Sequence, residues 1–209
     1  MPRRPDRPPL FPDCTGALVA GGQASRLGGV AKGLLQLDGE PIVARSLTLF
    51  RQLFPASIIV ANDAPPYSPF GAPVVKDVIA GKGAPSGLHS ALTTARTEWV
   101  FMAACDMPFL AAGPIAWLAE QRVGTRAAAV FWHGRLETLH AFWSRSCLPL
   151  VDRMLREGEP SMWTIATAVG ARFVPEEEWR RVDPLGRVFA NANTAEEAES
   201  LGLTLPPGA

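Results

Sequence analysis

Short runs of uninterrupted apolar residues constrain this chain more than any other feature. Residues 16–20 (GALVA) and 99–104 (WVFMAA) carry no polar side chain, so strands formed there must be covered on both faces. Segments with helical periodicity separate such runs, and this alternation predicts a mostly parallel sheet between two layers of helices. We therefore expect one α/β domain, a Rossmann-like three-layer sandwich.

The same reading predicts where the elements lie. The proline-rich start, residues 1–14, reads as a disordered arm, residues 15–203 as the domain and residues 204–209 as a flexible tail. Extended segments are expected at 16–20, 34–37, 57–61, 74–75, 99–104, 127–132, 138–143, 172–174 and 188–190. Helices are expected at 41–53, 86–96, 110–122, 148–157 and 194–201.

Charge and cysteine content exclude several classes of protein. Twenty Lys and Arg balance twenty Asp and Glu, which disfavours nucleic acid or an anionic membrane as a partner. Cys14, Cys105 and Cys147 are odd in number and lack CxxC spacing, which argues against a disulfide framework and a zinc ribbon. No apolar run reaches the roughly 20 residues of a membrane span, and the start lacks a signal-peptide core. We expect a cytoplasmic protein.

A glycine-rich loop follows the first predicted strand. Residues 19–32 (VAGGQASRLGGVAK) contain four glycines together with Arg26 and Lys32. Glycines let backbone N–H groups approach phosphate oxygens, and the two cations suit a triphosphate. The loop matches neither GxGxxG nor GxxxxGK[ST]. Taken alone, it could equally be a mobile surface loop with incidental basic residues.

Polar side chains follow later strands or lie near the C-terminus. Asp106 comes directly after the run at 99–104, which suits a magnesium ligand in the ligand cleft or the N-cap of the next helix. In the segment 189–197 (FANANTAEE), Asn191 and Asn193 could contact metal or substrate, and Asn193-Thr194 could cap a helix. His140 lies within an apolar run, where a lone histidine is usually a satisfied core residue.

These motifs, in this order, resemble the nucleotidyltransferases that share a GT-A-like fold. The nearest pattern is that of the molybdenum cofactor guanylyltransferases (MobA family), roughly LAGGxSxRMGGxDKxLL, which stands here as VAGGQASRLGGVAKGLL. The CDxPF/Y segment of that family lands on residues 105–109 (CDMPF), and its NxNTPEDL segment on residues 191 onward. The resemblance spans about residues 16–201.

The resemblance implies an activity and a set of site residues. GMP would pass from GTP to the terminal phosphate of molybdopterin with Mg²⁺ as cofactor, pyrophosphate would leave, and molybdoenzymes or their chaperones could receive the product. His140 would lie near the acceptor, although it could equally be core. Asn62 would lie on the guanine and ribose side, and Asp77 corresponds to the family's Asp before its Gly-Pro-Leu segment, although both could equally be turn formers. The implied catalytic residues are Arg26, Lys32 and Asp106, with Asp106 also the metal ligand; the implied nucleotide-binding residues are Val19, Ala20, Gly21, Gly22, Lys32, Asn62, Asp77 and Asp106.

Departures from the family pattern keep two alternatives open. Ala31 replaces the usual Asp before Lys32, Leu27 replaces Met, and Ser86 replaces Leu in the Gly-Pro-Leu segment. A non-catalytic protein that binds nucleotide would retain the fold with such losses. A sister enzyme that uses CTP, acting on molybdopterin or another phosphorylated acceptor, would share the mechanism; its loop usually reads LAAG.

Overall fold

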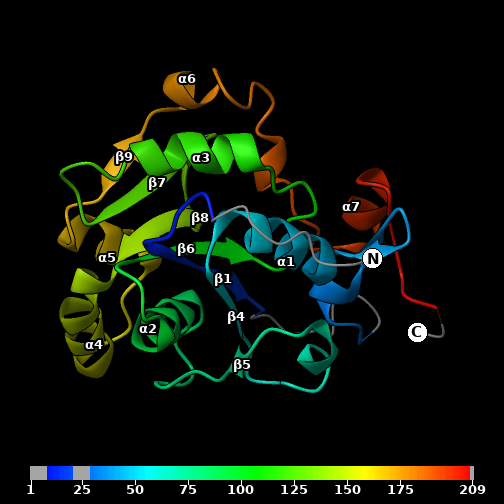
Figure 1. Ribbon diagram of the computed structural model, residues 1–209, viewed down its shortest axis with the longest axis horizontal. Coiled ribbons are helices and arrows are strands. Elements are labelled where there is room, and N and C mark those ends of the chain that lie inside the picture. Colours follow the sequence, from blue (N-terminus) through cyan, green and yellow to red (C-terminus); the bar gives the residue numbers. More distant parts are fainter. Residues whose placement is uncertain (1–8, 21–28, 208–209) are drawn as a thin grey trace.

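The structure is a computed structural model that describes residues 9–20 and 29–207, and a seven-stranded sheet forms its centre (Figure 1). The strand order is β5-β4-β1-β6-β8-β7-β9. Within it, β8 is antiparallel to both of its neighbours and the other pairs are parallel. The strands are β1 (Cys14–Val19), β4 (Ala56–Val60), β5 (Val74–Val75), β6 (Trp99–Ala104), β7 (Ala127–Trp132), β8 (Arg135–Ser144) and β9 (Arg172–Val174).

The central strands lie where their apolar sequences require. Every residue of β1 and of β6 is buried, which confirms that both faces of the sheet are covered. The end of β1 pairs in register with the ends of both neighbours, since Val19 lies opposite Val60 and Ala104. The carboxyl ends of β4, β1 and β6 therefore meet at one edge of the sheet.

Helices cover the sheet in two layers, as predicted (Figure 1). Helices α1 (Ile42–Leu53) and α3 (Ala112–Glu120) contribute buried residues to one apolar cluster. Helices α2 (Ala84–Thr94), α4 (Leu148–Glu157) and α5 (Met162–Ala168) contribute to the cluster on the other face. None of the helices in the described ranges is long and apolar enough to cross a lipid bilayer.

A small second sheet joins the C-terminal segment to the start of the domain. It consists of β10 (Leu203–Thr204), β2 (Gln36–Leu37) and β3 (Glu40–Pro41). Positive φ angles at Asp38 (54°) and Gly39 (78°) form the tight turn of the β2–β3 hairpin. Helix α7 (Ala195–Ser200) packs beside this sheet in a third apolar cluster, so residues near the C-terminus lie close to those that follow the glycine-rich loop.

The segment before β1 belongs to the folded domain. Phe11 lies 6.1 Å from Phe54 and 6.4 Å from Phe142 between ring centroids. Arg122 covers the Phe11 ring at 5.8 Å and donates to Asp13 at 3.0 Å. The ordered chain thus begins at least four residues before the predicted boundary at residue 15, because Phe11 finds apolar partners. At the other end, Thr204 of the predicted flexible tail lies in β10.

One predicted strand is wrong and several short helices were not predicted. Residues 188–190 were expected to be extended, whereas Arg187–Phe189 form the 3₁₀ helix η5. The buried carboxylate of Asp183 accepts hydrogen bonds from the N–H groups of Arg187 and Val188, both at 3.0 Å, which bends the chain there. In the described ranges, the other short helices are η2 (Lys32–Leu34), η3 (Ser68–Phe70), η4 (Arg145–Cys147) and α6 (Glu176–Trp179); these and α5 had no sequence prediction.

Candidate functional site

The predicted site residues that follow the strands gather at the carboxyl edge of the parallel strands. Val19 ends β1, and the N–H of Ala20 donates to Val60 at 2.8 Å. Asp106 follows β6, while Asn62 follows β4 and Asp77 follows β5. This edge is where α/β sheets bind their ligands. Gly21, Gly22 and Arg26, predicted to bind phosphates, lie outside the described residues.

Lys32, Asp106 and Asn193 form one hydrogen-bonded cluster, although up to 161 positions separate them in sequence. Nζ of Lys32 donates to Oδ2 of Asp106 at 3.0 Å and to Oδ1 of Asn193 at 2.8 Å. The side chains of Lys32 and Asp106 are only 17% and 12% exposed, so water screens this ion pair weakly. The ammonium group of Lys32 thus bridges two hard oxygen atoms at the edge of the sheet.

Close packing below this cluster brings Lys32 to Asp106. A Cβ on Gly33 would lie 3.1 Å from the Tyr67 ring and 3.2 Å from Cβ of Cys105, so any other residue here would crowd the contact between η2 and the end of β6. Burial raises the pKa of the Cys105 thiol to about 12. The thiol next to Asp106 therefore stays protonated in the folded protein and packs as a small apolar group.

A capping box at α7 sets the position of Asn193. The hydroxyl oxygen of Thr194 accepts from the N–H of Glu197 at 3.1 Å, which makes Thr194 the N-cap. Asn193 precedes the cap, so its side chain does not cap the helix and its amide oxygen is bonded to Lys32 instead. Asn191 is exposed and makes no side-chain hydrogen bond within the part of the chain that is described. The structure thus favours Asn193 over Asn191 as the site residue.

Asn62 and Asp77 form a second pair on the β4–β5 side of the edge. Nδ2 of Asn62 donates to Oδ2 of Asp77 at 2.8 Å, and the backbone N–H of Asp77 donates to Oδ1 of Asn62 at 3.1 Å. Asn62 is exposed and Asp77 is partly exposed, so their polar groups remain within reach of a ligand. Because β1 lies between β4 and β6, two strand spacings of about 5 Å each separate the starts of the two clusters.

His140 lies in the core rather than in the site. Its ring packs edge-on against Phe101, Phe189 and Trp179, with centroids 5.1–5.6 Å apart, and it is 0% exposed. Neither ring nitrogen has a hydrogen-bond partner among the described residues, so the histidine is buried but not satisfied. Burial lowers the pKa of His140 to about 4, against a smaller opposing effect of Asp183. The expectation of a substrate contact at His140 receives no support from this position.

We expect His140 to make stability fall with acidity. The pKa is about 4 in the folded state and about 6.5 in the unfolded chain, so only the unfolded chain binds the proton between these values. Folding stability is unaffected above pH 6.5 and falls by about 3 kcal/mol in total as the pH drops to 4. Urea unfolding of the wild type and of His140→Phe at pH 7, 5.5 and 4 measures this. The difference in free energy of unfolding between the two proteins should change by that amount from pH 7 to pH 4. A difference that does not change with pH would contradict the prediction.

Two further observations delimit the site. Among the described residues there is no group of three or more His, Cys, Asp and Glu side chains placed to hold a metal, so a metal here would depend on Asp106, amide oxygens and the substrate.

A surface pocket of about 190 Å³ beside α1 lies at the opposite edge of the sheet, where β4 begins, and takes no part in the site. It is lined by Leu47, Arg51, Phe54, Pro55, Ala56, Ser57, Gly71 and Ala72.

A Rossmann-like sheet with polar side chains gathered beyond the carboxyl ends of its parallel strands is typical of α/β proteins that bind nucleotides at that edge. The sequence model of the MobA-like NTP transferase domain matches residues 16–173. This chain belongs to the MobA-like NTP transferase family.

Individual relatives agree with that assignment. The molybdenum cofactor guanylyltransferase of Desulfosudis oleivorans is 30% identical over 197 residues, covering 93% of this chain and 96% of the relative. The fold is shared with molybdopterin-guanine dinucleotide biosynthesis protein A of Archaeoglobus fulgidus, with a TM-score of 0.75, 23% identity and coverage of 89% and 95% of the two chains. It is also shared with a Mycobacterium tuberculosis protein solved in complex with manganese, with a TM-score of 0.59, 18% identity and coverage of 82% and 97%.

Proposed function

We propose that this protein transfers GMP from GTP to the terminal phosphate of molybdopterin, releasing pyrophosphate. An oxygen of the acceptor phosphate forms a bond to the α-phosphorus of GTP as the bond from that phosphorus to the β-phosphate oxygen breaks. The observation that carries the proposal is the cluster of Lys32, Asp106 and Asn193 at the carboxyl edge of the sheet, in a chain of this family. A cytoplasmic setting agrees with three free cysteines, and a molybdoenzyme or its chaperone would receive the product.

The cluster fits a divalent metal such as Mg²⁺. Asp106 and Asn193 each direct one oxygen at the same ammonium group, at 3.0 and 2.8 Å, so the fold already places two hard ligands around a cation. Magnesium takes one or two carboxylates and completes its coordination with water and substrate phosphates. The manganese bound to the Mycobacterium tuberculosis relative in fold agrees with a divalent ion. Such an ion would neutralise charge on the phosphates during the transfer.

The residues of the chain would then act by position and charge. Lys32 can turn its flexible side chain from the two oxygens toward the phosphates of GTP. The Asn62–Asp77 pair offers amide and carboxylate groups to the nucleoside, with Val19 and Ala20 at the end of β1 between the two clusters. Arg26 and the Gly21–Gly22 backbone would hold phosphates. The acceptor phosphate is already ionised, so the reaction needs no general base, and the rate depends on positioning and electrostatics.

Two alternatives differ from this proposal: an enzyme that uses CTP instead of GTP, and a protein that binds nucleotide without catalysing transfer. A cytidylyltransferase would use the same cluster with CTP, and the site geometry by itself does not distinguish the two bases. A protein that only senses nucleotide would bind GTP without releasing pyrophosphate. Ala31 stands where the family has Asp, yet Lys32 still has an acidic partner in Asp106, so the loss of that Asp leaves the cluster intact.

We expect pyrophosphate release with GTP and no more than a few per cent of that rate with CTP, ATP or UTP. The assay supplies purified protein, Mg²⁺, molybdopterin and one nucleotide at a time, and the dinucleotide product is identified by mass spectrometry. Pyrophosphate release with CTP and not with GTP would show that the protein is a cytidylyltransferase. Tight binding of GTP with no pyrophosphate release under any condition would indicate that the protein only senses the nucleotide.

A further inference from the structure

Glu197 holds the backbone of the residue that supplies the amide oxygen of the cluster. Its Oε2 accepts a hydrogen bond from the N–H of Asn193 at 2.6 Å and from the N–H of Thr194 at 3.3 Å. A capping box requires only the second of these two bonds. The shorter bond goes to the residue outside the helix, and that residue is the one whose side chain contacts Lys32.

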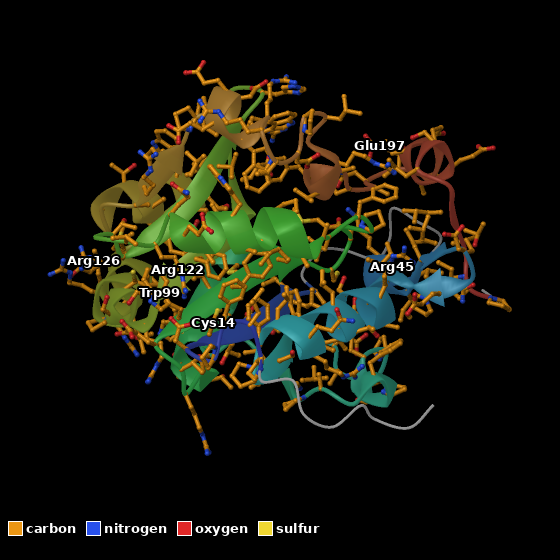
Figure 2. The ribbon with its side chains drawn as sticks, turned by 45° about the horizontal axis from the view of Figure 1, so that its top comes forward. Cys14, Arg45, Trp99, Arg122, Arg126 and Glu197 are labelled. Atoms are coloured by element: carbon orange, nitrogen blue, oxygen red, sulfur yellow. The ribbon has the colours of Figure 1, made fainter. Side chains whose placement is uncertain are left out.

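The orientation of Asn193 depends on its hydrogen bond to Glu197, because the chain on either side is anchored elsewhere. Ala192, on the N-terminal side, is fully buried in the third apolar cluster, so the chain is fixed up to that residue. On the C-terminal side, Leu203 of β10 pairs with Leu37 of β2, and both side chains are buried in the same apolar cluster. This contact anchors the chain that follows α7. Between these anchors, the backbone of Asn193 is held by the carboxylate of Glu197. Figure 2 shows Glu197 on α7, at the opposite end of the molecule from Cys14, Trp99 and Arg122.

We propose that Glu197 is a positioning residue that aims the amide oxygen of Asn193 at the cation site shared with Asp106. The inference rests on the proposed function for the meaning of that site, since the cation is the divalent ion of the transferase. The oxygen accepts from the ammonium group of Lys32; if Lys32 turned to the phosphates, the oxygen would remain in place for the ion. Glu197 touches neither substrate nor metal and acts through Asn193.

If Glu197 served only as part of the helix cap, its loss would lower the stability of α7 but would not change Mn²⁺ affinity. Thr194 supplies the other half of the capping box, so Thr194→Ala and Glu197→Ala should each lower Tm by about 2–4 °C. Only Glu197→Ala also removes the bond to the N–H of Asn193. Glu197→Gln retains an acceptor oxygen at the same position, so it should restore most of that bond.

The test compares Mn²⁺ affinity and thermal stability in these three variants and the wild type. Electron paramagnetic resonance titration gives the dissociation constant of Mn²⁺ alone, and a thermal scan gives Tm. We expect Glu197→Ala to weaken Mn²⁺ binding about tenfold, as changes to groups that hold metal ligands do, and Glu197→Gln to stay within about threefold of wild type. Thr194→Ala should lower Tm as much as Glu197→Ala while keeping Mn²⁺ affinity within about twofold.

Several results would overturn the positioning role. Wild-type Mn²⁺ affinity in Glu197→Ala, or an equal loss in Thr194→Ala, would reduce Glu197 to a helix cap. Failure of the wild type to bind Mn²⁺ would overturn the cation site itself. The proposed function is judged separately, by pyrophosphate release from GTP in the wild type: absence of release together with the expected Mn²⁺ pattern would reject the transferase reaction and keep the role of Glu197.

Discussion

Asp106→Asn should lower the rate of GMP transfer at least about a thousandfold while the protein still folds. The substitution removes the one carboxylate of the cluster, and with it most of the attraction for a divalent ion. Asparagine has the same shape and still accepts a hydrogen bond from Lys32, so we expect Tm to change by only a few degrees. Pyrophosphate release under saturating GTP and Mg²⁺ measures the first effect, and a thermal scan measures the second.

The matched control for Asp106→Asn is Asp152→Asn, on helix α4. Asp152 accepts from His89 at 3.1 Å and from Arg156 at 2.8 Å, and it belongs to neither cluster of the candidate site. Its substitution removes a carboxylate that is also hydrogen-bonded, yet turnover should remain close to wild type. Turnover above about a tenth of wild type in Asp106→Asn would show that Asp106 does not hold the metal.

Lys32→Met should have opposite effects on metal binding and on turnover. The ammonium group lies 3.0 and 2.8 Å from the two oxygen atoms that would ligate the ion, so it competes with the ion for them. Its removal should tighten the binding of Mn²⁺ alone by about fivefold or more, because a positive charge this near opposes a second cation. Turnover should fall about a hundredfold or more, because the phosphates lose a charged partner in the transition state.

Arg45→Met serves as the control for Lys32→Met. Arg45 lies on α1 and pairs at 3.5 Å with Glu40, both nearly half exposed, so its removal changes the net charge equally without touching the cluster. Mn²⁺ affinity should change less than twofold in this variant. Unchanged or weaker Mn²⁺ binding in Lys32→Met would mean that the lysine does not occupy the place of the ion, and the metal would then have to bind elsewhere.

Most of the fold could be predicted because it follows from local patterns. The continuous apolar runs that became β1 and β6 require cover on both faces, and this requirement alone indicates a parallel sheet between helices. The failures have physical causes that lie outside those patterns. Residues 187–189 turn because Asp183 accepts from the N–H groups of Arg187 and Val188, and Phe11 is ordered because the fold brings it against the rings of Phe54 and Phe142.

The candidate site divides in a similar way. Lys32 and Asp106 were predicted because one lies in the glycine-rich loop and the other follows an apolar strand, whereas Asn62 and Asp77 were implied by the family resemblance. The sequence also contains the signal for Glu197, a threonine followed three residues later by a glutamate. Neither pattern predicts that the oxygen of Asn193 lies 2.8 Å from Nζ of Lys32.

By itself, the sequence determined the class of fold and the family, since periodicity and motif order are properties of the chain. Only the tertiary structure placed His140 in the core and joined Lys32 to both Asp106 and Asn193. These contacts span 74 and 161 positions and depend on how helices, turns and the small second sheet pack. Distances of this kind arise from the packing of the whole domain, and no local pattern contains them.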